Sequence, residues 1–199
     1  MSSVSKIFLT AFILLSIWVA TDFLIPRSSN FRQFDPIVIG QLDADMWRSY
    51  YETKRVKLFW QMSKLMCNQF NAPFWRSFPM AYDAAKAAFV FKEVQSREDY
   101  AKALPFLEKY YAQINALSDK PFDVKTMARQ ELEWWIIRRE PQYTTADWEQ
   151  ILAQTAAILY GEPAEKFKDY AHLRVEAMVL RDGKKENISE ANWLVINDL

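Results

Sequence analysis

The segment from Asp43 to Glu52 combines three acidic residues with Arg48 and also contains Trp47. On a helix, Asp45, Arg48 and Glu52 share one face because they are three and four residues apart. The two carboxylates, Asp45 and Glu52, have the chemistry of an acid–base pair or of oxygen ligands for a hard metal ion. The simpler interpretation, which we favour, is an ion-paired helix face bordered by aromatic residues.

A second segment combines two tryptophans with two arginines. Trp134 and Arg138 are four residues apart, as are Trp135 and Arg139, so each guanidinium can lie over an indole ring. Glu131 shares a helix face with Trp135. Adjacent tryptophans point about 100° apart on a helix. We therefore expect one to enter the core and the other to pack on a neighbouring helix, a partner protein or lipid.

Tryptophan and arginine are frequent at the energetic centres of protein interfaces. Core packing explains the same pattern and is the main alternative. If a partner protein binds, the residues that we assign to it are Trp47, Arg48, Trp134, Trp135, Arg138 and Arg139.

His172 is the only histidine, and Glu176 follows it by four residues. Such a pair can poise a general base, but a usual zinc or di-iron site needs further histidines. Cys67 is the only cysteine, which excludes an internal disulfide and a Cys-x-x-Cys site. We expect no metal, no cofactor and no enzymatic activity. The residues that an enzyme would use are Asp45, Glu52, Glu131 and His172.

Composition narrows the possible functions further. The 25 basic and 25 acidic residues leave no positive excess, so we expect no nucleic-acid partner. No phosphate-binding loop, Gly-x-Ser-x-Gly elbow or glycine-rich dinucleotide motif is present. The chain has three glycines, whereas average usage gives about fourteen. That shortage favours helices over strands and tight turns.

Aromatic residues are dense between residues 70 and 91, in a segment that also contains several alanines. A pocket for a flat apolar ligand would use this pattern, although ordinary core packing explains it as well. The aromatic residues of this segment are Phe70, Phe74, Trp75, Phe78, Tyr82, Phe89 and Phe91.

The N-terminal segment is apolar enough to cross a bilayer. Residues 7–25 would form a helix of about 28 Å, and Trp18 and Asp22 suit a membrane interface where both reach water. A cleaved signal peptide is one alternative, but cleavage after Ala20 would need a small residue where Trp18 stands. A buried core helix is the other. We predict an uncleaved single-pass signal anchor that contacts the lipid bilayer through residues 7–25.

The fold class that we predict is all-α, with one transmembrane helix followed by a soluble bundle of about seven mostly antiparallel helices. The predicted parts are a tail (1–6), an anchor (7–26), a polar connector (27–34) and a helical domain (35–199). Basic residues are nearly balanced around the anchor. We place the domain outside the cytoplasm because a short N-terminal tail is typical of an exported domain.

Several helix limits follow from capping signals. Asp35-Pro36 opens a helix of about 30 residues, and Pro79 kinks or restarts the next one. The other signals are Ser96 with Asp99, a break at Pro105, Asp123, Thr144 with Asp147, an end at Gly161, a start at Pro163, an end near Arg181, and a start at Asn187 with Ser189 as a competing cap.

Two functional hypotheses follow. The first is a non-catalytic, membrane-anchored accessory or scaffolding subunit of a larger membrane protein complex, of respiratory, photosynthetic or secretory type. It would act by protein–protein contact with the other subunits. The alternative is a helical binding domain for a hydrophobic small molecule at the membrane surface.

Overall fold

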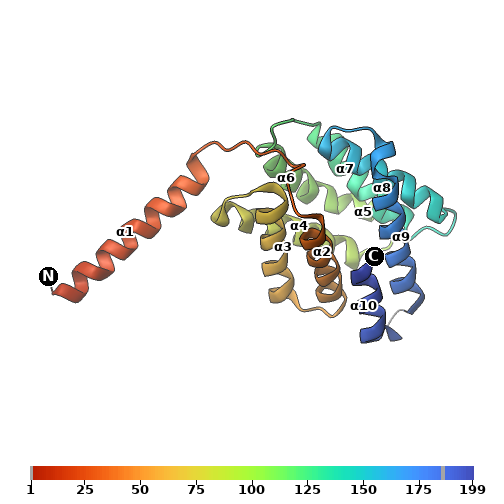
Figure 1. Ribbon diagram of the computed structural model, residues 1–199, viewed down its shortest axis with the longest axis horizontal. Coiled ribbons are helices and arrows are strands. Elements are labelled where there is room, and N and C mark those ends of the chain that lie inside the picture. The colour runs from red at the N-terminus through yellow and green to blue at the C-terminus, as the bar shows by residue number, and fades with distance from the viewer. Residues whose placement is uncertain (1, 185–186) are drawn as a thin grey trace.

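The computed structural model describes residues 2–184 and 187–199; Met1 and residues 185–186, which the predicted tail and domain include, lie outside them. A long helix, α1 (Ser3–Leu24), extends away from a domain made of the remaining helices (Figure 1). The predicted all-α class is confirmed: the described residues contain no strand, only an isolated bridge between Ser29 and Ser118. The helices of the domain are α2 (Pro36–Tyr51), α3 (Arg55–Phe70), α4 (Phe74–Glu93), α5 (Arg97–Tyr100), η1 (Ala101–Ala103), α6 (Leu104–Asn115), α7 (Val124–Ile137), α8 (Thr145–Tyr160), η2 (Ala164–Phe167), α9 (Lys168–Lys184) and α10 (Glu190–Asp198).

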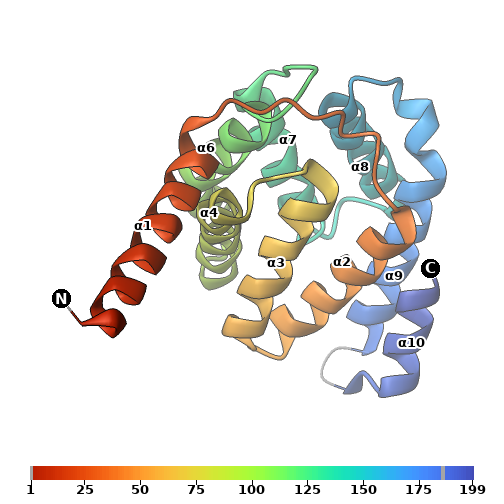
Figure 2. The same ribbon diagram turned by 60° about the vertical axis from the view of Figure 1, so that its left-hand side comes forward.

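The domain is a closed ring of helices. Each long helix packs against the next one in the sequence, from α2 to α3, α4, α6, α7, α8 and α9. The last helix, α10, then packs against both α9 and α2 and closes the circle (Figure 2). A ring of sequential neighbours leaves a centre that side chains must fill or leave open.

The predicted 30-residue helix after Asp35 is wrong, because the chain turns back between α2 and α3. Thr53 adopts a left-handed conformation with φ 58°, and the amide of Lys54 donates to the carbonyl of Ser49 at 2.9 Å. No glycine or proline marks this turn. The apolar stripe therefore belongs to two packed helices, and its members Met46 and Met66 are both buried.

Local capping signals are confirmed at most other helix ends. Asp35 accepts hydrogen bonds from the amides of Ile37 and Val38, with proline at the first position of α2. Asp123 caps α7, and Thr144 with Asp147 forms a capping box at α8. Gly161 ends α8 with φ 61°, a conformation that glycine adopts without strain.

Other limits differ from the prediction. Pro79 lies inside the uninterrupted helix α4, and α9 continues past Arg181 to Lys184. Ser189, the competing cap, begins α10 in place of Asn187. Because the first helix is split and a short α5 is present, nine α-helices follow α1 in the described residues, against about seven predicted.

Asp22 fastens α1 to the domain. We expected this carboxylate to reach water at an interface, but its residue is only 4% exposed. It accepts a hydrogen bond of 2.9 Å from the backbone amide of Trp75, in the first turn of α4. No side chain of its own segment caps α4, so Asp22 provides that cap from a distant helix.

The connector between α1 and α2 also packs on the domain. The amide of Ser29 donates to the carbonyl of Leu117 at 2.7 Å, and the amide of Asp119 donates to Ser29 at 3.0 Å. Phe31, within the segment predicted to be polar, is 3% exposed and meets the ring of Phe70 edge-on at 5.0 Å. Residues 27–34 are therefore part of the packed structure.

Helix α10 closes the ring through one buried face. Trp193 and Ile196 pack with Ala44 of α2 and Ala177 of α9. At the edge of this contact, Arg48 of α2 binds the carboxylate of Glu190. The buried aromatic ring carries most of the apolar area of this junction.

We predict that Trp193→Ala lowers the free energy of unfolding by about 3 kcal/mol, because it removes a buried indole and leaves a cavity. Leu194→Ala is the matched control, since Leu194 is 63% exposed on the same helix. Chemical denaturation of both variants checks the difference, and hydrogen exchange should rise in α10 and α2 only for Trp193→Ala. Equal effects of the two substitutions would contradict the role of Trp193 in closing the ring of helices.

Candidate ligand-binding cavity

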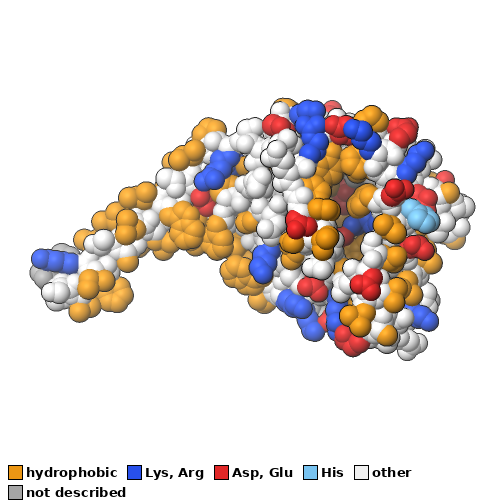
Figure 3. Space-filling view, viewed as in Figure 1, with side chains coloured by type: hydrophobic (Ala, Val, Ile, Leu, Met, Phe, Trp, Pro, Cys, Tyr) orange, Lys and Arg blue, Asp and Glu red, His pale blue; other side chains and the backbone are white. Residues whose placement is uncertain are grey.

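The centre of the ring is open. Two overlapping chambers occupy it, with volumes of about 470 Å³ and about 440 Å³. Protein interiors are normally packed as densely as organic crystals, and spaces of several hundred Å³ are typical of small-molecule sites. The space-filling view shows a hollow rimmed by hydrophobic side chains, with charged atoms deeper inside (Figure 3).

The first chamber is mainly apolar. Its wall comes from α2, α3, α4, α6, α7, α8, η2 and α9. Representative apolar lining residues are Ile39, Leu65, Phe70, Leu107, Leu152, Leu159 and Phe167.

Small residues keep this chamber open. Gly40, Ala84, Ala88 and Ala156 all line it. A Cβ atom added at Gly40 would meet no atom within 4 Å, so this glycine borders empty space instead of a close helix contact. Two other alanines of α4, Ala81 and Ala87, are fully buried, whereas Ala88 faces both chambers.

Glu131 lies on the wall that the two chambers share. The hydroxyl of Tyr111 donates to one carboxylate oxygen at 2.9 Å, and Nε1 of Trp135 donates to the other at 3.0 Å. The expected common face of Glu131 and Trp135 is thus confirmed. Burial among protein atoms raises the pKa of this carboxyl, although the two hydrogen bonds oppose the shift.

An ion pair crosses the centre of the ring. The guanidinium of Arg174, on α9, binds the carboxylate of Asp43, on α2. Its charged carbon lies 5.0 Å from the ring centre of Trp47 and 5.8 Å from that of Trp134. The Nε atom of Arg174 is buried and has no hydrogen-bond partner within the described chain. This donor is enclosed by protein atoms, so the hydrogen-bond set of the guanidinium is incomplete within the described chain.

The second chamber carries excess positive charge. Five basic residues line it, against three acidic ones: Lys92, Arg138, Arg139, Arg174 and Arg181, and Asp43, Glu131 and Asp182. Arg138 binds Asp182 and donates to the hydroxyl of Tyr51 at 2.9 Å. Arg181 also has a buried Nε without a partner among the described residues. Both chambers are thus mainly apolar, and the second adds the basic residues Lys92, Arg138, Arg139 and Arg181 to its lining.

The two tryptophans of α7 both lie inside the domain. Trp134 is 7% exposed and belongs to the buried cluster with Val175 and Met178. Trp135 packs edge-on against Phe91 of the neighbouring helix α4, with ring centres 5.3 Å apart. Of the alternatives for the second tryptophan, the neighbouring helix is the one that this contact bears out.

The expected stacking of arginines on these tryptophans within α7 is wrong. Arg138 lies over Trp47, at 5.9 Å, and Arg139 lies over Phe91, at 4.0 Å. Arg139 also donates to the carbonyls of Phe91 and Val94 at the end of α4. Both side chains contact hydrogen-bond acceptors and aromatic rings on neighbouring elements instead of the tryptophans of α7.

The six residues that we assigned to a partner protein do not share one exposed surface. Trp47, Trp134, Trp135, Arg138 and Arg139 line the second chamber. Arg48 lies outside it and pairs with Glu52 at 2.8 Å, which is one of the two steps of the predicted Asp45–Arg48–Glu52 ladder. A role of these side chains in holding a partner stays a prediction.

The acidic and histidine residues proposed for an enzyme are also dispersed. Asp45 is exposed on α2, and Glu52 binds Arg48 and Lys54. His172 is 60% exposed and pairs with Glu149 of α8, 2.8 Å away. Only Glu131 faces the cavity. Within residues 2–184 and 187–199, no group of three or more metal-binding side chains comes together.

Sequence reasoning missed the residues that set the polarity of the cavity. Asp43, Arg174 and Asp182 are not singled out as ligand contacts by the sequence analysis. Asp43 and Arg174 are 131 positions apart. No local spacing signals such a pair, because the contact depends on closure of the ring.

We predict that Glu131→Gln stabilises the fold as the pH rises. A carboxyl with a raised pKa in the folded state binds its proton more tightly there, so stability falls as pH increases through the interval above its usual pKa of 4.5. The amide keeps an acceptor for Tyr111 or Trp135 and carries no charge. The gain at neutral pH should reach about 1.4 kcal/mol for each unit by which the pKa is raised. Denaturation curves across pH check it, and a pH-independent difference would contradict it.

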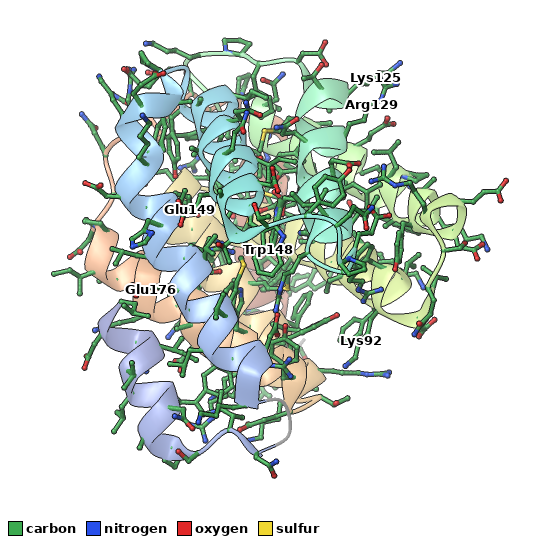
Figure 4. All side chains as sticks on the ribbon, turned by 90° about the vertical axis from the view of Figure 1, so that its right-hand side faces the viewer. Lys92, Lys125, Arg129, Trp148, Glu149 and Glu176 are labelled. Atoms are coloured by element: carbon green, nitrogen blue, oxygen red, sulfur yellow. The ribbon has the colours of Figure 1, made fainter. Side chains whose placement is uncertain are left out.

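We predict that His172 titrates above its usual pKa of 6.5, because Glu149 holds the protonated ring. Figure 4 shows Glu149 and Glu176 on the outer side of α8 and α9. The fold gains stability from this pair below pH 6.5 and loses it as pH rises through the higher folded pKa. NMR titration of the single histidine should give a lower pKa in Glu149→Gln. The control Glu176→Gln should change it less; the reverse order would contradict the pairing.

The search for similar proteins gave no match: no protein-family model, no curated protein and no solved structure is similar to this chain. The functional argument therefore rests on the geometry of the cavity.

Proposed function

We propose that this protein is a membrane-anchored binding domain for a small amphipathic molecule that has an apolar body and an anionic group. The observation that carries the proposal is a pair of cavities with a shared wall, both mainly apolar, of which the second is also lined by Lys92, Arg138, Arg139 and Arg181. The apolar body occupies the first chamber and the anionic group occupies the second. This is the small-molecule alternative of the two sequence-based hypotheses, with the polar group of the ligand now specified.

The apolar chamber supports a hydrophobic body. Its lining is dominated by aliphatic and aromatic side chains, and burying such a surface on both partners is favourable by about 25 cal/mol for each Å². The small residues Gly40, Ala84, Ala88 and Ala156 keep the chamber wide. Mixed pockets of this kind, mostly apolar with a few oriented polar groups, are the usual form of small-molecule sites.

The basic chamber supports an anionic group. The guanidinium groups of Arg174 and Arg181 each have an Nε donor that is buried and unpartnered in the described chain. Guanidinium binds carboxylate, phosphate and sulfonate groups through several parallel hydrogen bonds. A bound anion would offset the excess of positive charge around it.

Glu131 fits the same ligand. Burial raises the pKa of its carboxyl, and the protonated form repels an anion less than the carboxylate does. Tyr111 and Trp135 hold the group against the wall and away from solvent. Binding of an anion should therefore weaken as Glu131 loses its proton.

We also propose that α1 is an uncleaved anchor that crosses the bilayer once, with the domain outside the cytoplasm. The helix has 22 residues and a mean hydropathy of 2.1 in its most apolar window, which the rest of the chain hardly covers. A core helix of a soluble protein would be mostly buried. A cleaved signal would remove Trp18, which stacks on Phe74 of α4.

The binding test uses the full chain in lipid nanodiscs and trifluoromethyl-terminated decanoate as the probe. We expect a fluorine NMR resonance of bound probe that empty nanodiscs do not give. Ala88→Leu should remove this resonance, because Ala88 lines both chambers and a larger side chain fills them. Ala112→Leu is the control, since Ala112 is exposed on α6 and does not line the cavity.

Competition separates the charge requirement from simple hydrophobicity. Decanoate should displace the probe at lower concentration than decanol or decylammonium does. An equal resonance with Ala88→Leu, or equal competition by all three compounds, would contradict the proposal. A subunit role instead predicts that further chains co-purify in fixed ratio, which native mass measurement of the detergent-extracted protein would detect.

A further inference from the structure

Six aromatic rings from three helices meet where α1 joins the domain. Trp18 of α1 stacks on Phe74 and meets Trp75 edge-on, both at 5.4 Å between ring centres. Phe78 of α4 lies 4.9 Å from Phe74 and 5.5 Å from Trp60. We name this cluster the aromatic collar; its members are Trp18, Phe59, Trp60, Phe74, Trp75 and Phe78.

The collar is partly uncovered. Trp18 is 47% exposed, Trp60 51% and Phe74 40%, and Val56, one turn before Trp60 on α3, is 73% exposed. In Figure 3 hydrophobic side chains continue from α1 onto the adjoining part of the domain. Exposed tryptophan and phenylalanine grouped beside an apolar helix are a surface that water does not favour.

Asp22 fixes the position along α1 at which the aromatic collar lies. Its hydrogen bond to the amide of Trp75 ties the last turn of α1 to the first turn of α4. The chain has no charged residue between Lys6 and Asp22, and the next charge after Asp22 is Arg27. The uncharged stretch before Asp22 is residues 7–21, about 22 Å of helix, and its C-terminal end lies at the collar. Trp18 is six residues before the end of α1, or about 9 Å.

We propose that the aromatic collar, with Val56, rests in the headgroup layer of the bilayer that α1 crosses. Tryptophan concentrates at this depth, where its ring is partly apolar and its N–H reaches polar groups. Lys57 and Lys64, exposed on α3 beside Trp60, suit anionic headgroups. The proposal depends on the proposed crossing by α1 and is independent of the cavity.

A lipid surface fits this face better than a second protein does. The collar is continuous with the helix that carries the apolar surface, so lipid that surrounds α1 also meets Trp18, Phe74 and Trp60. The alternating aromatic and lysine residues on α3 resemble the interface band of membrane proteins rather than a buried protein contact, which is depleted in lysine. The domain would then stand on the membrane in one orientation.

The test uses full-length single-cysteine variants in a Cys67→Ser background, each labelled with an NBD fluorophore. Val56→Cys and Trp60→Cys probe the collar region, and Leu14→Cys probes α1. Glu176→Cys is the control, because Glu176 is exposed on α9, on the side of the domain away from α1 (Figure 4). The vesicles contain phosphatidylcholine and phosphatidylglycerol, with nitroxide groups at headgroup depth or in the chain region.

We expect a blue shift at positions 56 and 60 and loss of their fluorescence with headgroup nitroxides. Position 14 should respond to the chain-region nitroxide, and position 176 to neither. If position 14 is quenched and positions 56 and 60 are not, the collar proposal is overturned and the anchor stands. If position 14 is not quenched, both fail.

Two further outcomes would also overturn the collar proposal. Quenching at position 176 equal to that at 56 and 60 would indicate unspecific adsorption of the domain. A blue shift at 56 and 60 without nitroxide quenching would indicate that protein, such as a second copy, covers this face. None of these results depends on the decanoate measurement, so failure of the ligand proposal is distinguishable.

Discussion

The ion pair between Asp43 and Arg174 is the constraint on which the centre of the domain depends. It joins α2 and α9, which α10 separates in the ring, and the rings of Trp47 and Trp134 flank the guanidinium. Both side chains are half-buried, and removing one partner of such a pair leaves a poorly solvated charge without its counterion. The helices of the ring pack mainly on their neighbours, and this ion pair adds a polar contact across the centre. Its two side chains occupy space between α2 and α9.

The Asp43–Arg174 ion pair lines both chambers of the cavity, whose other lining residues differ. Aliphatic and aromatic residues surround one side, and arginines that find only some of their acceptors surround the other. Glu131 lies at the border, with its pKa raised by burial. A domain selected only for stability would fill this space with larger side chains, so small residues such as Gly40 and Ala88 favour an occupant over an empty core.

Much of the local structure was predictable because capping is a property of a few neighbouring residues. Asp35, Asp123 and Thr144 each fixed a helix start in this way. The turn at Thr53 was not predictable, since a threonine with positive φ has no distinctive composition and depends on the packing of α2 against α3. The cavity was predictable only in part. The sequence indicated Glu131, but Glu131 lines the same cavity as Asp43 and Arg174 only because the ring of helices closes.

The contacts around Asp22 change the mechanical nature of the junction between anchor and domain. A free connector of eight residues would act as a tether and let the domain turn in any direction. Here Asp22 caps α4 and Phe31 is buried, so the junction behaves as a rigid lever. Transmembrane helices tilt to match the thickness of their bilayer. In the bilayer crossing that we propose for α1, a change in lipid thickness would therefore rotate the entire domain, and with it the direction in which the cavity opens.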